Sequence, residues 1–297
     1  MKNDSRRKAL KQLGTGASLL AINPFSIHSS SGKEDQSAEM KSKLKNNINH
    51  SVCRWCYSKI PLEDLCLAAK KIGLKSIELV GPGDWATLKK HGLHVAMPNG
   101  GEIGLTKGFN HVEYHAELFQ KYSEIIPKVA DAGFDKIICF SGNREGISEE
   151  EGMANAAKGL KPLLSIAEKY KVTLTMELLN SKVNHKDYQC DHTSWGVGLC
   201  KMLGSDRFKL LYDIYHMQIM EGDVIATIKA NHDYINHYHT GGVPGRNEID
   251  ISQELYYPAI MKAILATGYK GYVAQEFIPA KKDALASLEA GVRICDV

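Results

Sequence analysis

No run of apolar residues in this 297-residue chain is long enough to span a lipid bilayer, so the sequence predicts no transmembrane helix. Charge of one sign is also scarce: a formal net charge of +3 argues against a nucleic-acid-binding protein. The seven cysteines are odd in number and scattered along the chain, which argues against a disulfide framework. Together these absences favour a globular protein whose partner is a small molecule.

The cysteines do not favour a redox or zinc site either. Cys53 and Cys56 have the spacing of a redox pair, but they fall in a predicted first strand, whereas a thioredoxin-type pair opens a helix. No second cysteine pair follows at metal-binding spacing, so zinc held by thiolates is not predicted.

The first fifty residues differ in composition from the rest. A basic segment with two adjacent arginines, residues 5–11, precedes a short apolar segment, residues 13–22. This order resembles a twin-arginine export signal. We therefore predict export to the periplasm, with a signal segment over residues 1–32, a flexible linker over 33–50 and a catalytic domain over 51–297. The alternative is a disordered basic tail on a cytoplasmic protein.

From residue 51 onwards, short β-like segments alternate with stretches of helical periodicity. Strict alternation predicts parallel strands joined by right-handed crossovers. Eight units in about 245 residues match an α/β fold of the (β/α)₈ TIM barrel type. An open doubly wound sheet would need a glycine-rich phosphate-binding turn after the first strand, and none is present. The predicted strands are residues 51–57, 76–80, 93–97, 136–140, 172–177, 208–213, 234–239 and 271–276.

The last four predicted strands share one feature: each ends on a residue that can bind a metal ion or transfer a proton. These residues are Glu177, Asp213, His239 and Glu276. A single acid at a strand end often only caps the next helix. Four in succession predict a common site, because the C-terminal ends of barrel strands face one mouth. An oxygen-rich set with one imidazole predicts one Mn²⁺ or Mg²⁺ per chain, with Co²⁺ or Fe²⁺ as alternatives.

Two further residues suit a substrate-binding role. His216 follows Asp213 by three positions, so one helical turn places both on the same side. Arg246 lies in a glycine-rich loop just after His239, and its guanidinium group could hold a carboxylate through two hydrogen bonds. The alternative for each is an ordinary loop side chain.

Three segments carry a resemblance to a known family: residues 176–181 (MELLNS), 213–223 (DIYHMQIMEGD) and 242–246 (GVPGR). They resemble the hydroxypyruvate isomerase family, within the xylose isomerase-like TIM barrels that include sugar phosphate isomerases and epimerases. The resemblance covers roughly residues 51–295.

The resemblance implies a divalent metal ion, an acid/base pair and a substrate contact surface. Hydroxypyruvate isomerases commonly have Gln where this chain has His239, whereas His is usual at that position in ketose 3-epimerases. The implied metal ligands are Glu177, Asp213, His239 and Glu276, the acid/base pair is Glu177 and Glu276, and the substrate-contacting positions are His216 and Arg246.

We therefore predict a metal-dependent isomerase or epimerase of a small hydroxy-carbonyl or sugar substrate, which transfers a proton through an enediolate. The first alternative is an exported keto-sugar epimerase or lyase, which would also begin by removing a proton α to a carbonyl. The second is a non-catalytic sugar-binding barrel, against which the complete ligand set argues. The sequence leaves open which glutamate is the base and whether the chain forms a homo-oligomer.

Overall fold

The computed structural model describes residues 43–297, so the predicted signal segment and the first part of the predicted linker lie outside the described residues. The barrel begins earlier than the predicted boundary at residue 51. Strand β1 (Asn49–Cys53) starts at Asn49, and the side chain of Ile48 before it is buried. Asn47 donates a hydrogen bond of 2.9 Å to the carbonyl oxygen of Val297, which ties this segment to the C-terminal end.

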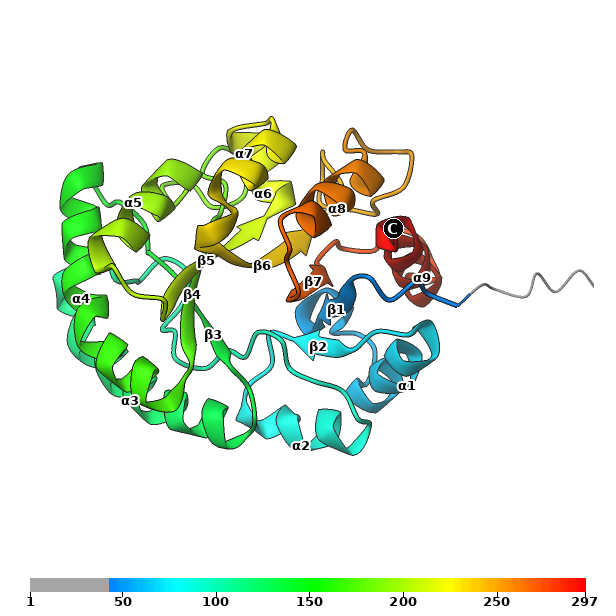
Figure 1. Ribbon diagram of the computed structural model, residues 1–297, viewed down its shortest axis with the longest axis horizontal. Coiled ribbons are helices and arrows are strands. Elements are labelled where there is room, and N and C mark those ends of the chain that lie inside the picture. Colours follow the sequence, from blue (N-terminus) through cyan, green and yellow to red (C-terminus); the bar gives the residue numbers. More distant parts are fainter. Residues whose placement is uncertain (1–42) are drawn as a thin grey trace, which may run out of the picture. The chain divides into compact units, whose positions relative to one another are not determined.

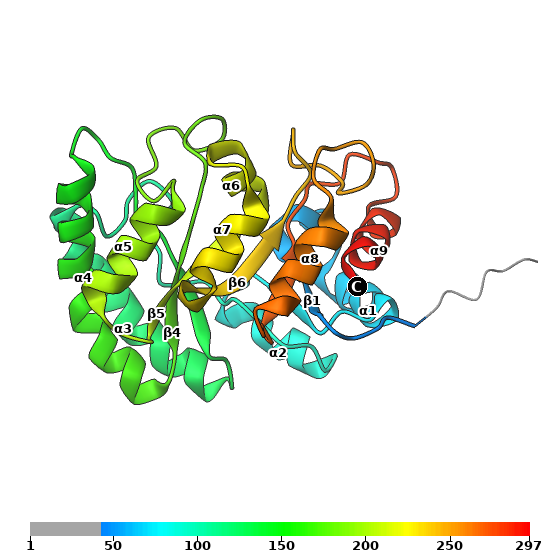
Figure 2. The same cartoon turned by 45° about the horizontal axis from the view of Figure 1, so that its top comes forward.

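Seven parallel strands form one curled sheet in the order β2-β1-β7-β6-β5-β4-β3, with helices around its outside (Figures 1 and 2). This arrangement confirms the predicted α/β barrel fold. Besides β1, the strands are β2 (Ser76–Glu78), β3 (Lys136–Cys139), β4 (Thr173–Glu177), β5 (Phe208–Asp213), β6 (Ile235–Thr240) and β7 (Tyr272–Gln275).

The predicted strand over residues 93–97 is not a regular strand. It makes a single bridge, from His94 to Ser76, yet it still lies between β2 and β3. On one side Leu79 donates to the carbonyl oxygen of Met97 at 2.9 Å, and on the other Ile138 donates to that of Pro98 at 3.1 Å. The segment is irregular because the amide of Ala96 donates to the Ser76 hydroxyl at 2.9 Å, and Pro98 has no amide hydrogen.

The helices follow the predicted alternation, with two successive helices after β5. Helix α4 runs through Pro162 without being divided. None of the helices in residues 43–297 is long and apolar enough to cross a membrane. Their bounds are α1 Leu62–Ile72, α2 Pro82–Lys90, α3 His115–Asp131, α4 Glu149–Tyr170, α5 Thr193–Leu203, α6 Ile214–Met220, α7 Val224–Asn231, α8 Tyr257–Ala266 and α9 Ala284–Cys295.

A long connection, residues 98–111, runs from the irregular segment towards α3 and lies against the chain that follows β3. Asn110 donates from its backbone amide to the carbonyl oxygen of Ser141 at 2.9 Å. A Cβ atom on Gly108 would overlap the backbone of Ser141 and Gly142. Only glycine permits this close approach, which fixes the position of the connection.

We expect Gly108→Ala to lower the melting temperature by about 5 °C, because the added methyl group must push two backbone segments apart. Gly83→Ala, in the first turn of α2, is the matched control, since its Cβ would meet nothing within 4 Å. Thermal unfolding monitored by circular dichroism measures both. Equal melting temperatures for Gly108→Ala and the wild type would contradict the tight packing of this connection.

Candidate active site

Four predicted side chains meet at the C-terminal ends of neighbouring strands. Glu177 ends β4, Asp213 ends β5, His239 lies near the end of β6, and Glu276 directly follows β7. Each offers one ligand atom, and these atoms lie within 4.8 Å of one another. All four side chains are buried. The parallel register of the sheet therefore brings together the set expected from the sequence.

The imidazole of His239 lies between two groups of carboxylates. Its Nδ1 is 2.7 Å from Glu276 Oε2 and 3.2 Å from Glu177 Oε1, and its Nε2 is 2.9 Å from Glu78 Oε1. Both nitrogens therefore face carboxylate oxygens, and Nδ1 is the nitrogen through which His239 would bind a metal ion held by Glu177 and Glu276. An outer carboxylate that orients a histidine in this way is the usual partner of a metal-binding imidazole.

The donor set suits a hard divalent cation. Three carboxylates and one imidazole provide the required ligand atoms. The Oε1 atom of Glu177 is buried and makes no hydrogen bond among the described residues, although Nδ1 of His239 lies 3.2 Å away. A buried carboxylate oxygen without a donor is costly unless a cation contacts it, so the geometry is compatible with a metal ion bound among these residues.

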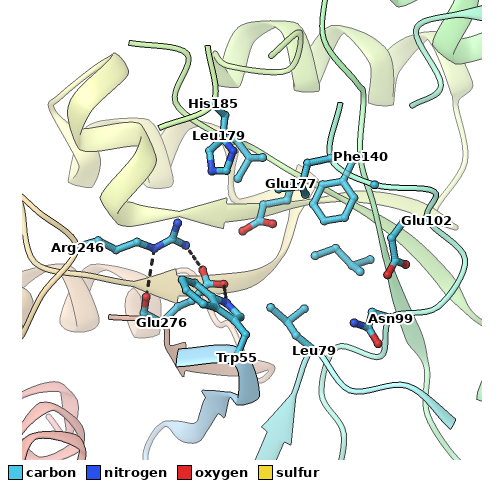
Figure 3. A pocket seen from close by; sticks show the side chains of 13 residues that line it. Trp55, Leu79, Asn99, Glu102, Phe140, Glu177, Leu179, His185, Arg246 and Glu276 are labelled. Carbon is cyan, nitrogen blue, oxygen red and sulfur yellow. Dashed lines mark hydrogen bonds and ion pairs between the residues drawn. The ribbon is translucent and has the colours of Figure 1, made fainter. Parts of the chain in front are cut away.

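Arg246 supplies positive charge at the same place. Its Nη2 lies 2.9 Å from Asp213 Oδ2 and also contacts Glu276, as Figure 3 shows for the latter residue. The Cζ atom of the guanidinium group lies 5.3 Å from the centroid of the Trp55 ring and 5.3 Å from that of the Tyr215 ring, within the range of cation–π contacts. Arg246 is therefore held in a fixed position beside the carboxylates.

The environment sets the pKa values of the two glutamates apart. Burial, reinforced by the charge of Glu276, raises the pKa of Glu177. Burial acts in the same direction on Glu276, but the charges of Arg246 and His239 outweigh it and hold the pKa of Glu276 well below its usual range. Burial also raises the pKa of Asp213 to about 8, although Arg246 opposes the shift. The same surroundings therefore shift the pKa values of the two glutamates in opposite directions.

His216 lies between two hydrogen-bond donors. The backbone amide of Asn180 lies 3.1 Å from its Nδ1, and burial followed by the Arg246 charge lowers the pKa of His216 well below its usual value. Nη1 of Arg246, which can only donate, lies 2.9 Å from the Nε2 atom of His216. His216 therefore helps to hold the guanidinium group of Arg246 beside the carboxylates.

A cavity of about 500 Å³ opens beside this cluster (Figure 3). One end is polar and contains Glu177, Glu276 and Arg246. The middle is apolar, and the other end is again polar. The lining residues are Trp55, Leu79, Asn99, Glu102, Gly104, Leu105, Ile138, Phe140, Glu177, Leu179, His185, Arg246 and Glu276.

The structure adds residues that the sequence analysis did not select. Trp55 donates from Nε1 to Glu276 Oε1 at 2.7 Å, and it lies between Cys53 and Cys56. Burial raises the pKa of both of these thiols, so neither favours the reactive thiolate. Glu78 ends β2, but it lies inside the predicted strand of residues 76–80, so the strand-end criterion did not select it.

A parallel α/β barrel with carboxylates and a histidine gathered at its strand ends defines a class of barrel enzymes. The chain belongs to the xylose isomerase-like TIM barrel family, which it matches over residues 66–293. This confirms the superfamily to which the sequence resemblance pointed.

Curated relatives within this class are named as isomerases. The 2-oxo-tetronate isomerase of Cupriavidus necator is 29% identical over 203 residues, which cover 67% of this chain and 70% of the relative. The hydroxypyruvate isomerase of Escherichia coli is 28% identical over 243 residues, which cover 77% of this chain and 90% of the relative.

Among solved structures, the 3-keto-D-glucoside 4-epimerase of Escherichia coli has the same fold, with a TM-score of 0.68 at 18% identity. The match covers 83% of this chain and 98% of that one.

The loop that carries Arg246 is anchored by a buried carboxylate. Glu248 accepts hydrogen bonds from the backbone amides of Ala280 at 3.1 Å and Lys281 at 3.0 Å, and from the hydroxyl of Ser287 at 2.8 Å. These bonds join the β6–α8 connection to the chain that follows Glu276. Glu248 therefore fixes the two segments whose side chains meet in the Arg246–Glu276 ion pair.

We expect Glu248→Ala to lower the free energy of unfolding by about 2 kcal/mol, because it leaves buried donors without an acceptor. Glu254→Ala is the control: this exposed carboxylate in the same connection contacts only the Gln218 side chain, at 3.0 Å. Urea denaturation measures both variants. If the two lose the same amount of stability, the anchoring role of Glu248 is wrong.

Proposed function

We propose that the protein is a divalent-metal-dependent isomerase or epimerase that moves a proton between adjacent carbons of a hydroxy-carbonyl substrate, as a hydroxypyruvate isomerase does. The observation that carries this proposal is the meeting of Glu177, Asp213, His239 and Glu276 within 4.8 Å at one end of a cavity. The relatives named 2-oxo-tetronate isomerase and hydroxypyruvate isomerase support the same reaction class.

The four ligand residues would hold the metal ion, with Mn²⁺ or Mg²⁺ favoured by their oxygen-rich composition. When bound, such an ion polarises a carbonyl and orients its neighbouring hydroxyl group. Arg246 provides donors at this place and lies beside His216, with its Nη1 2.9 Å from the Nε2 atom of His216. These donors would bind the substrate oxygen on which negative charge develops during proton removal.

Glu177 and Glu276 are the two carboxylates of the cluster that line the cavity, so they would transfer the proton. Glu276, which Trp55 and Arg246 hold in place, would take a proton from the hydroxyl-bearing carbon to give an enediolate. Glu177 would deliver a proton to the neighbouring carbon, and the hydroxyl proton would pass to the former carbonyl oxygen.

A second candidate, epimerisation of a keto-sugar, is favoured by the volume of the cavity, about 500 Å³. A three-carbon hydroxy acid would fill only a small part of that space. The same base would remove a proton α to the carbonyl, and return of a proton on the opposite face would invert the carbon. The neighbour of similar fold named 3-keto-D-glucoside 4-epimerase supports this substrate class.

We expect the purified protein to contain about one divalent metal ion per chain and to lose turnover when a chelator removes it. Metal content is measured by mass spectrometry, and turnover is measured on hydroxypyruvate and on a panel of keto-sugars. Mn²⁺ or Mg²⁺ should restore activity. Full activity without metal would contradict the mechanism, and failure to take up metal or turn over any substrate would favour the non-catalytic sugar-binding barrel.

We expect Glu177→Gln and Glu276→Gln each to lower kcat by about a thousandfold, because each removes one half of the proton transfer. Substrate carrying deuterium on the hydroxyl-bearing carbon separates the two roles. Glu177→Gln should still release deuterium to water, whereas Glu276→Gln should not.

The matched control is Glu168→Gln, a surface carboxylate paired with Arg207. It should behave as the wild type does. Metal content is measured for every variant, so that loss of the ion is distinguished from loss of the proton carrier. Release of deuterium by Glu276→Gln but not by Glu177→Gln would reverse the assignment.

A further inference from the structure

The end of the cavity remote from the proton-transfer residues is also polar. Glu102 and Asn99, both in the connection over residues 98–111, line it. Figure 3 shows them across the cavity from Arg246, with Phe140 and Leu79 between the two ends. The proposed reaction uses neither Glu102 nor Asn99.

One carboxylate oxygen of Glu102 is hydrogen-bonded within its loop, and the other can accept a hydrogen bond from a ligand. Its Oε2 accepts a hydrogen bond of 2.8 Å from the backbone amide of Gly100. Within residues 43–297, its Oε1 has no hydrogen-bond or ion-pair partner, and neither does the side-chain amide of Asn99. The hydrogen bond that stabilises the loop therefore uses only one of the two carboxylate oxygens of Glu102.

The wall between the two ends is apolar. Leu79, Ile138 and Phe140 line it, and Ile138 and Phe140 are buried apart from the surface they present to the cavity. Pockets of this composition bind a ligand body by apolar contact and fix its orientation through a few polar groups at defined positions. The C–H face of a sugar suits such a wall, whereas a short hydroxy acid held at Arg246 would leave it uncovered.

We propose that Glu102, with Asn99 beside it, forms a distal subsite that binds hydroxyl groups of a ketose or keto-glycoside at the end remote from the reacting carbons. A sugar hydroxyl can donate to Glu102 Oε1, and the same or the adjacent hydroxyl can accept from the Asn99 amide. The inference rests on the proposed function, because it places the reacting carbons beside Glu177 and Glu276. Glu102 is then a specificity-determining residue that favours a sugar over a three-carbon substrate.

The test compares a long and a short substrate in the same metal-loaded protein. The long probes are D-fructose and methyl 3-keto-D-glucoside, and the short probe is hydroxypyruvate. Glu102→Ala should raise KM for the long probe that is turned over by about tenfold, which corresponds to the loss of a hydrogen bond to a charged group. Its kinetic parameters on hydroxypyruvate should stay within about twofold of the wild type.

Two further variants guard against indirect effects. Glu102→Gln keeps an acceptor for the Gly100 amide, so it preserves the loop while removing the charge, and it should show the same selective change at smaller size. Glu113→Ala is the matched control, because this exposed carboxylate lies just beyond the connection over residues 98–111 and does not line the cavity. It should leave KM unchanged for every substrate.

Binding is measured separately through Trp fluorescence, since Trp55 lines the cavity. Suppose that the wild type binds sugar but turns over no substrate, and that Glu102→Ala binds sugar more weakly. This result would support the subsite and contradict the proposed function. Normal turnover of a keto-sugar with an unchanged KM in Glu102→Ala would overturn the subsite and leave the function standing. Equal losses on long and short substrates, or no sugar binding by the wild type, would also overturn the subsite.

Discussion

The whole site depends on the burial of three carboxylates in one small volume. Glu177, Asp213 and Glu276 offer ligand atoms within 4.8 Å of one another together with His239, and such a cluster is unstable unless positive charge accompanies it. Arg246 supplies part of that charge, and a divalent cation would supply more. Several other features keep Arg246 in place: contacts of its guanidinium group with the rings of Trp55 and Tyr215, and Glu248, which joins its loop to the segment after Glu276.

Residues of the site come from two parts of the barrel: the ends of the strands and the connections that follow them. Strand ends carry the clustered carboxylates and His239, and their relative positions are set by the hydrogen-bond register of the sheet. The connections supply Trp55, Arg246 and Glu102, and they form the rest of the cavity. Such a division lets one reaction be kept while the substrate changes, because a connection can vary without moving the strand ends.

The sequence predicted the parts of the site that regular structure positions. Glu177, Asp213 and Glu276 were predicted because an acid at the C-terminal end of a buried parallel strand must lie at the same mouth of the barrel as the others. His216 was predicted because it lies one helical turn from Asp213. Trp55 and Glu102 were not found, because the path of a connection depends on tertiary contacts such as the approach of Gly108 to Ser141.

The irregular segment over residues 93–97 was predicted as a strand for a related reason. Its apolar pattern is that of a strand, but the bond from the Ala96 amide to the Ser76 hydroxyl is a contact between distant residues. The two ends of the described chain lie together. The backbone amide of Lys45 donates to Asp296 Oδ2 at 2.7 Å, and the Asn47 side chain donates to the carbonyl oxygen of Val297. Both contacts lie where β1 begins, whereas the cavity opens where the strands end. A support attached near Lys45 or Val297 would therefore leave the entrance clear, so substrate would still reach the cavity.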